Sequence, residues 1–346
     1  MSLPFGPPIE PMLAKLSREM PRGDGWCYEP KWDGFRSIVF RDGDDVYVQS
    51  RDLRPFNRYF PELLPALRRA LPKRCVVDGE IVLPGKDGLD FDGLQMRLHP
   101  AESRVRKLSA ESPTSFVAFD LLAQGDRDLR GKGFAERRAA LEKALGSKVA
   151  EGVPAAGGTS VLLTPQLTDA DEAEAWFEHL APLGLEGVVA KRGDLPYRPG
   201  ERVMVKVKRV KTVDCLVGGY RAYRAGPGVG SLLLGLYDDA GVLHYVGHTS
   251  SFKARERVEV LEKLRPFEGK KSFSRAWEAE SSGGRTPDSM SRWTVGREQA
   301  PWTEVEPVLV CEVTIDKMQG DRFRHAATFL RWRTDKPPEA CTFDQL

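Results

Sequence analysis

The sequence contains 346 residues, of which 41% are hydrophobic and 29% are charged, and its formal net charge is +2. This composition is typical of a globular protein with enough apolar residues for two domain cores, and it excludes a disordered chain or a strongly basic one. Any nucleic-acid-binding surface therefore has to be a local one.

Cysteine usage and the distribution of apolar residues limit the cellular setting. The five cysteines are scattered and form no CxxC pair, which argues against a zinc ribbon or a disulfide framework and favours a reducing compartment. The amino-terminal segment has no basic region followed by an apolar one, and no apolar run approaches the ~20 residues of a membrane span. We therefore expect a cytoplasmic protein without a membrane anchor, and a monomer by default.

The first part of the chain alternates irregularly between predicted helices and strands. The proline-rich residues 1–22 look like a lead-in segment. Residues 26–40 are predicted to form a strand, residues 41–45 an Asp/Gly-rich turn and residues 46–50 a second strand. Further along, the patterns predict helices at 62–70, 134–145 and 169–180, with Asp169 as a possible N-cap, and strands at 75–83, 115–122, 187–191 and 202–208. Residues 146–160 are a loop by composition. This irregular order predicts an α+β domain.

The pattern changes near residue 211. Short strands separated by Gly and Asp turns are predicted at 212–220, 231–237, 242–248 and 308–315, with one helix at 251–264. Such a series is typical of a small β-barrel. The polar segment 269–297 is predicted to be a mobile surface loop. We therefore expect two domains, residues 1–209 and residues 210–346.

Lys31 is a candidate nucleophile in the segment EPKWDGFR, next to an Asp-Gly turn. A lysine attacks only when its amine is neutral, and nearby cations or a metal ion favour that form. The motif alone is weak, because about nine in ten lysines are solvated surface charges.

Three carboxylates are candidates for metal binding. Asp78 and Glu80 occur in the apolar segment VVDGEIV and Glu186 in LEGVVAK, where a carboxylate is costly unless it is paired, hydrogen-bonded or bound to a metal. A magnesium ion held by a few carboxylates and by substrate phosphates fits this set. The alternative is that Asp78 merely belongs to a bend and that Glu186 caps or pairs with a lysine.

Two basic clusters are candidates for phosphate binding. Lys206 and Lys208 alternate along a predicted strand, so both project from one face, which suits a triphosphate or a phosphodiester. An edge strand protected by lysines is an equally good interpretation. Near the C-terminus, RWRTDK supplies Arg333 and Lys336, with Asp335 able to orient Arg333. Taken alone, this segment is more simply a solvated terminus.

Together these clusters resemble the covalent nucleotidyltransferase superfamily, and specifically the ATP-dependent DNA ligases of the compact bacterial type, including the ligase module of end-joining enzymes. Seven motifs occur in the family's order across essentially the whole chain. They are K-x-D-G-x-R at Lys31–Arg36, Ser50-Arg51, D-G-E at Asp78–Glu80, Phe119-Asp120, E-G-[VI]-[VM]-x-K at Glu186–Lys191, K-x-K at Lys206–Lys208 and R-x-D-K at Arg333–Lys336. The sequence departs from many relatives at Met204, where they carry tryptophan.

The resemblance implies an α+β adenylation (nucleotidyltransferase) domain over residues 1–209 and a C-terminal OB-fold β-barrel over residues 210–346. It implies a DNA ligase that uses ATP with Mg²⁺ or Mn²⁺, forms lysyl-AMP, adenylates the 5′-phosphate of a nick in duplex DNA and seals it to the 3′-hydroxyl in DNA repair. In this family the barrel swings over the active site, so we expect a hinge at residues 208–212.

The resemblance also implies residue roles, with Lys31 as the nucleophile. The expected nucleotide-binding residues are Glu29 and Arg36 around adenine and ribose, Arg51 and Glu80 at the ribose or nick phosphate, Phe119 on the adenine face, Lys206 and Lys208 at the α-phosphate, and Arg333 and Lys336 at pyrophosphate. Asp78 and Glu186 are expected to help hold the metal ion.

Two alternative functions remain at the level of the sequence. An RNA ligase or another polynucleotide nucleotidyltransferase shares the lysine motif and the barrel. A non-catalytic nucleic-acid-binding protein with a degenerate core belongs to a different class, and the intact Lys31, D-G-E and K-x-K motifs disfavour it.

Overall fold

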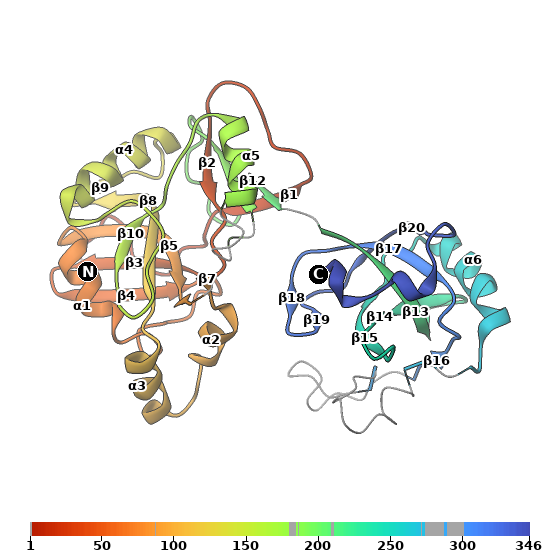
Figure 1. Ribbon diagram of the computed structural model, residues 1–346. Coiled ribbons are helices and arrows are strands. Elements are labelled where there is room, and N and C mark those ends of the chain that lie inside the picture. Colours follow the sequence, from red (N-terminus) through yellow and green to blue (C-terminus); the bar gives the residue numbers. More distant parts are fainter. Residues whose placement is uncertain are drawn as a thin grey trace. The chain divides into compact units, whose positions relative to one another are not determined.

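The computed structural model describes residues 2–86, 88–179, 185, 187–208, 211–270, 272–273, 287–288 and 301–346. The chain divides into two compact units, Met1–Arg209 and Val210–Leu346, which run from red to green and from green to blue in Figure 1. None of the helices formed by these described residues has the length and apolar character needed to cross a membrane.

A small sheet of the first unit has the strand order β1-β12-β11-β2. Its strands are β1 (Leu13–Ser17), β12 (Arg202–Lys208), β11 (Gly187–Arg192) and β2 (Trp26–Pro30). Because β1 pairs in parallel with β12, the predicted lead-in segment contributes an edge strand. Helix α5 (Ala170–His179) packs on this sheet. The Asp169 carboxylate accepts hydrogen bonds from the backbone N–H groups of Asp171 and Glu172, which confirms the predicted N-cap.

A larger sheet has the order β10-β8-β5-β3-β4, with β9 beside β8. Its strands are β3 (Phe35–Asp42), β4 (Asp45–Ser50), β5 (Arg74–Val82), β8 (Ser115–Gln124), β9 (Arg127–Asp128) and β10 (Val161–Leu163). Helices α1 (Leu63–Ala70) and α4 (Phe134–Leu145) pack on one face of it. The other face packs against residues of the small sheet, including Met204, which is buried against Ile38 and Phe40. Met204, which stands where many relatives carry tryptophan, is therefore packed in the core.

The chain crosses from the small sheet to the larger one at Lys31–Gly34. The sequence predicts one continuous strand over 26–40, and this is wrong, because β2 ends at Pro30 and β3 begins at Phe35 in a different sheet. A Cβ atom on Gly34 would lie 2.2 Å from the carbonyl oxygen of Ile81, so only glycine permits this close crossing. The break places Lys31 at the junction of the two sheets.

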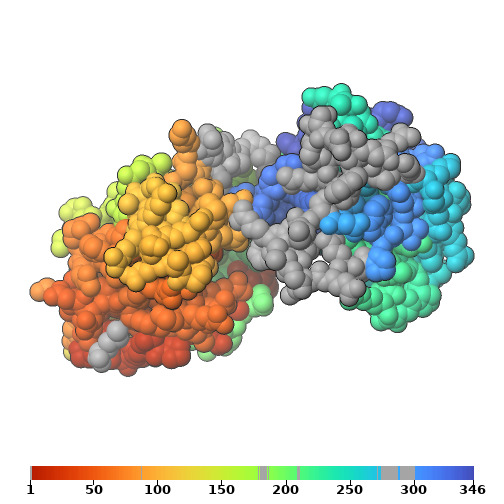
Figure 2. All heavy atoms as spheres, turned by 90° about the horizontal axis from the view of Figure 1, so that it is seen from below, coloured from red at the N-terminus to blue at the C-terminus, as the bar shows by residue number. Residues whose placement is uncertain are grey.

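Helices α2 (Phe91–Met96) and α3 (Glu102–Glu111) follow the short hairpin of β6 (Pro84–Gly85) and β7 (Gly88–Leu89). Sequence patterns did not predict either helix, because α3 is exposed on most sides and lacks an apolar stripe. Figure 2 shows this golden-yellow region on the surface of the first unit. Fully buried Arg97 anchors it, donating to Glu62 at 2.8 and 2.9 Å and to the carbonyl oxygens of Tyr59 and Ser112.

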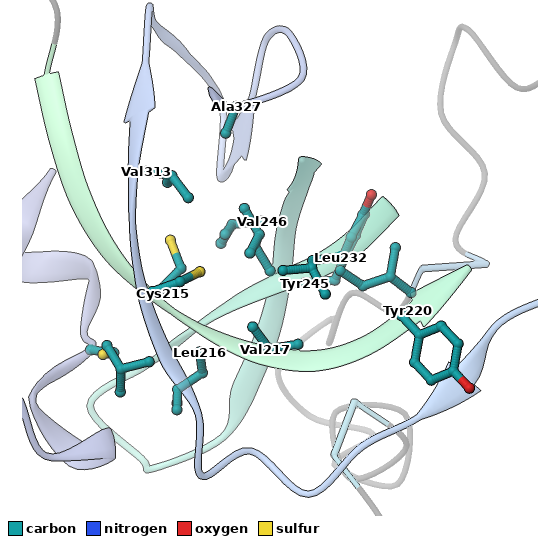
Figure 3. Close-up of a cluster of buried hydrophobic side chains, with 14 of the residues drawn as sticks. Cys215, Leu216, Val217, Tyr220, Leu232, Tyr245, Val246, Val313 and Ala327 are labelled. Atoms are coloured by element: carbon teal, nitrogen blue, oxygen red, sulfur yellow. The ribbon is translucent and has the colours of Figure 1, made fainter. Parts of the chain in front are cut away.

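The second unit is a curved antiparallel sheet of order β15-β14-β13-β17-β20, with β16 beside β13. Its elements are β13 (Lys211–Ala222), β14 (Val229–Tyr237), β15 (Leu243–Thr249), α6 (Ala254–Leu264), β16 (Thr303–Glu304), β17 (Val310–Ile315), β18 (Met318–Gln319), β19 (Arg322–Phe323) and β20 (Thr328–Trp332). Figure 3 shows Val217, Leu232 and Val246 gathered in its core.

The predicted strands of this unit are confirmed to within a few residues, and β20 is an additional one. The predicted loop 269–297 lies mostly outside the described residues.

We predict that Arg97→Ala lowers the free energy of unfolding of the first unit by about 3–5 kcal/mol, because it leaves Glu62 and two carbonyl groups without their buried donor. Chemical denaturation measures the effect. Arg106→Ala is the matched control, since Arg106 pairs with Glu102 on the exposed face of α3 and its loss should cost about 0.5 kcal/mol or less. Equal effects of the two substitutions would contradict the anchoring role of Arg97.

Candidate active site

Lys31 follows the last residue of β2, and its backbone N–H donates to the carbonyl oxygen of Gly187 at 2.7 Å. This bond extends the pairing of β2 with β11 and fixes the start of the crossing. The side chain is half-buried. Both Glu80 of β5 and Lys206 of β12 lie within electrostatic reach of it. Lys31 is therefore at a point where both sheets contribute charged side chains.

Cations gather on the Lys31 side of β12. Burial lowers the pKa of Lys206, and the positive charges of Lys208, Lys31 and Arg51 lower it further. Crowded lysines and arginines are electrostatically unfavourable unless an anion joins them. The predicted nucleophile after β2 thus lies near the predicted phosphate-binding residues Arg51, which follows β4, and Lys206 and Lys208 of β12, and these surroundings favour a bound polyphosphate.

Arg36 is held by a buried carboxylate. Its Nε and Nη2 atoms donate to the two oxygens of Asp78 at 2.6 and 2.7 Å, and Asp78 is fully buried. Tyr197 also donates its hydroxyl to Asp78, at 2.6 Å. Burial alone would lower the pKa of Arg36, but Asp78 more than offsets this and raises it above its ordinary value. The arginine is a fixed cation.

Phe119 lies beside this pair on β8 and is 5% exposed. The guanidinium of Arg36 lies 4.4 Å from its ring centroid and the ammonium of Lys191 lies 4.6 Å from it, distances at which cation–π attraction operates. Lys191 also pairs with buried Glu29 at 2.6 Å. The predicted stacking of Phe119 on adenine stays a prediction.

The half-buried carboxylate of Glu80 is opposite Arg36 in the register of β5 and β3. Burial raises the pKa of Glu80 to about 7, and the positive charges of Arg36 and Lys31 only partly oppose this. A carboxylate with a raised pKa favours a further positive charge nearby, such as a cation brought with a substrate.

The R-x-D-K residues form a network within the second unit. Arg333 donates to both Asp335 oxygens, at 2.9 and 2.8 Å, and to both oxygens of Asp214, at 3.1 Å each. Lys336 donates to Asp214 at 2.8 Å. Asp335 holds the pKa of Arg333 above its ordinary value. Gln345 fixes the Asp214 backbone, accepting from its N–H at 3.0 Å and donating to its carbonyl at 3.1 Å.

The described residues contain no group of three or more His, Cys, Asp or Glu side chains that could hold a metal ion by themselves. Glu186, a predicted metal ligand, lies outside the described residues. Glu80 remains as a carboxylate beside the cationic group. This donor set fits Mg²⁺, which proteins commonly bind through one or two carboxylates together with substrate phosphates.

Two family models match the chain in succession. The model of the ATP dependent DNA ligase domain matches residues 11–208, and that of the ATP dependent DNA ligase C terminal region matches residues 225–336. The chain belongs to the ATP-dependent DNA ligases. This enzyme therefore uses ATP and a divalent metal ion, and a lysyl-AMP intermediate is part of its reaction.

Curated relatives support the same family over the full length. The ligase is 48% identical to DNA ligase C of Mycobacterium tuberculosis and 47% identical to DNA ligase C2 of Mycolicibacterium smegmatis, over 100% of this chain and 96% of each relative. A solved structure from a study of Lig E DNA ligases matches with a TM-score of 0.52 and 17% identity, covering 94% of this chain and 99% of that one, and shows the fold. The family models and the curated relatives favour DNA ligase over the alternatives weighed from the sequence.

Sequence analysis missed three residues that organise the site. Tyr197 and Asp214 lie outside the recognised motifs, and only the structure shows that they contact Asp78 and Arg333. Lys191 ends the E-G-[VI]-[VM]-x-K motif, but the sequence predicted no role for it. The register of β2 and β11 places Glu29 opposite Val189, two residues before Lys191 on the same face, and the ion pair is diagonal, so strand pairing was a signal that could have found it.

We predict that Glu80 makes the stability of the first unit depend on pH. The folded-state pKa is raised to about 7, so its stabilising contribution is complete below the unfolded pKa of about 4.3 and is lost as pH rises through about 7. Glu80→Gln should therefore gain about 2 kcal/mol relative to wild type between pH 5 and pH 9. Denaturant unfolding of both proteins at the two pH values measures this, and a constant difference would contradict it.

Proposed function

We propose that this ligase seals nicked duplex DNA through AMP carried on Lys31, as part of DNA repair. The observation that carries the assignment is the position of Lys31 at the junction of two sheets, within electrostatic reach of Lys206 and Glu80. A nucleophile for phosphoryl transfer needs this setting, because each step moves negative charge onto phosphate oxygens. A cytoplasmic location and a monomeric state stay predictions.

The proposed reaction has three transfers. The first two occur at the α-phosphorus of ATP, and the third occurs at the 5′-phosphate of the DNA. Lys31 Nζ forms an N–P bond to the α-phosphorus of ATP and loses a proton, and the bond to pyrophosphate breaks. An oxygen of the 5′-phosphate at the nick then attacks that phosphorus and forms a P–O–P linkage, while the N–P bond breaks and the Lys31 amine regains a proton. Finally the 3′-hydroxyl loses a proton and attacks the adenylated 5′-phosphate, which releases AMP.

The cations around Lys31 have a shared role in this proposal. Lys206, Lys208 and Arg51 bind phosphate oxygens, first of ATP and then of the nick. Burial and the neighbouring positive charges together lower the pKa of Lys206, and a bound polyphosphate would relieve the repulsion between the cations. Glu80, with Glu186 from the sequence, would hold the divalent ion, which when bound neutralises phosphate charge.

Besides Glu80, which the resemblance places at the ribose or nick phosphate, two predicted roles change in the light of the contacts. Asp78 is fully buried and already accepts hydrogen bonds from Arg36 and Tyr197, so we propose that it positions Arg36 and does not bind the metal ion. Glu29 is 2% exposed and pairs with Lys191, so its side chain positions Lys191. Arg36 then keeps its predicted place at the nucleotide, held in one orientation.

In the second unit, Arg333 and Lys336 are proposed to orient pyrophosphate during the first transfer only. Asp214 is the residue on which both side chains converge. It is 9% exposed, and its backbone is fixed by Gln345. We propose that Asp214 presets these two cations, since a flexible lysine or arginine otherwise loses side-chain entropy on binding.

Replacing the nucleophile tests the assignment. Lys31→Ala should abolish labelling of the protein by ATP that carries radioactive α-phosphate, because Lys31 is the proposed acceptor of AMP. It should also abolish sealing with ATP, while some sealing of a pre-adenylated nick persists, since the third transfer does not pass through Lys31. Lys132→Ala, an exposed lysine paired with Glu136, is the control. Stoichiometric labelling of the Lys31 variant would refute the assignment.

A step-specific defect tests the role of Asp214. Asp214→Asn should slow ATP-dependent labelling of Lys31 about ten-fold or more, because Arg333 and Lys336 lose their shared anchor. Sealing of a pre-adenylated nick should stay within about two-fold of wild type, since no pyrophosphate is involved. Glu312→Gln, which breaks the neighbouring pair with Arg331, should leave both rates unchanged. An equal loss in both assays would mean that Asp214 only stabilises the unit.

A further inference from the structure

A hollow of about 460 Å³ lies in the second unit beside the R-x-D-K segment. Its walls come from the last turn of α6, from the start of β17 with the two residues before it, and from the end of β20 with the segment that follows (Figure 1). Its lining includes Lys263, Leu309, Trp332, Arg333, Lys336 and Pro337. Cations and apolar side chains therefore share one concave surface, a composition that suits a charged ligand.

The two R-x-D-K cations bring no excess positive charge to this hollow. The carboxylates of Asp335 and Asp214 accept hydrogen bonds from Arg333 at 2.8 to 3.1 Å. Asp214 also accepts from Lys336 at 2.8 Å, so two positive charges face two negative ones. Glu312 lies within electrostatic reach of Arg333 but has its own arginine partner. Pyrophosphate carries several negative charges, and a further cation would therefore strengthen its binding.

Lys263 supplies such a cation. Among the described residues it has no carboxylate partner, and its ammonium lies 5.3 Å from the ring centroid of Trp332, which directly precedes the R-x-D-K segment. Cation–π attraction holds an ammonium over a ring without neutralising its charge. The acidic neighbours of Lys263 on α6 are Glu259 and Glu262. Glu259 pairs with Arg255 at 3.0 Å, and neither carboxylate lines the hollow. The charge of Lys263 is thus available to a ligand there.

We propose that Lys263 is a further substrate-contacting residue of the first transfer, in which it binds the terminal phosphates of ATP and then the released pyrophosphate together with Arg333 and Lys336. This inference rests on the proposed role of the R-x-D-K segment in that transfer. As Lys31 forms its bond to the α-phosphorus, the bond to pyrophosphate breaks, and the added cation stabilises the negative charge that develops on the leaving group. The later transfers involve no pyrophosphate, so Lys263 has no part in them.

The reverse of the first transfer measures this contact. Added pyrophosphate attacks the α-phosphorus of lysyl-AMP, which re-forms ATP and frees Lys31. Lys263→Met removes the charge and keeps an unbranched side chain against Trp332. The pyrophosphate concentration that gives half the maximal rate should rise about ten-fold, because one charge-assisted contact is lost.

Two further measurements separate this role from a structural one. In Lys263→Met, sealing of a pre-adenylated nick should stay within about two-fold of wild type, since that step involves no pyrophosphate, and the thermal midpoint should be unchanged. Lys263→Arg keeps the positive charge, so its pyrophosphate dependence should return to within about three-fold of wild type.

Lys253→Met is the matched control, since Lys253 is an exposed lysine at the other end of α6 and does not line the hollow. Arg333→Ala is the positive control and should raise the half-saturating pyrophosphate concentration. If it does so and Lys263→Met does not, the inference is wrong. The inference is also wrong if Lys263→Met lowers the thermal midpoint and slows both assays equally, or if Lys253→Met gives the same rise. No change in either Lys263→Met or Arg333→Ala would instead remove the proposed role of the R-x-D-K segment.

Discussion

The buried ion pair of Arg36 and Asp78 is the interaction on which the rest of the first unit's site depends. It joins neighbouring strands β3 and β5 of the larger sheet, and Tyr197 ties it to the segment between β11 and β12. Desolvating both charges is costly, and removing one partner of such a pair typically costs about 3–5 kcal/mol. The geometry offsets this cost with two short bonds and a tyrosine donor. As a result, Arg36, which is five residues after Lys31, is held in place against the ring of Phe119.

Charge is arranged differently around the two groups of proposed phosphate-binding cations, one in each unit. Around Lys31, burial and the positive charges of its neighbours both lower the pKa of Lys206, so we expect an incoming polyphosphate to stabilise the whole group. In the second unit, Arg333 and Lys336 already have the carboxylates of Asp214 and Asp335 as partners. These carboxylates hold the two cations in position before a ligand binds, so the ligand has less side-chain ordering to impose.

Much of the fold follows from the sequence because the strands and helices carry clear periodic patterns. Helix α4 and strand β12 have the bounds that the patterns predict. The break at Lys31–Gly34 does not follow from propensity, because the flanking residues favour strand and only the approach to Ile81 requires the crossing. Helix α3 could not be predicted because its sequence has little apolar periodicity. It is held instead by the contacts of Arg97, which donates to the carbonyl oxygen of Ser112 at the end of the helix.

The candidate site shows the same limit. Sequence motifs identified which residues carry charge, but charge alone did not separate Asp78, which is saturated by Arg36 and Tyr197, from Glu80, which keeps a raised pKa. The difference lies in their contacts, because Asp78 accepts hydrogen bonds from Arg36 and Tyr197, whereas Glu80, two residues further along β5, lies near Lys31 and Arg36. The partners Tyr197 and Asp214 are distant in sequence from the residues that they hold, so no local pattern could have revealed them.

The most direct test of the account is peptide mapping of the ligase by mass spectrometry after incubation with ATP and magnesium. The account predicts one adenylylated peptide, with AMP on Lys31, and loss of that AMP when nicked duplex DNA is added. AMP on a different lysine, or AMP on Lys31 that persists in the presence of a nick, would contradict it.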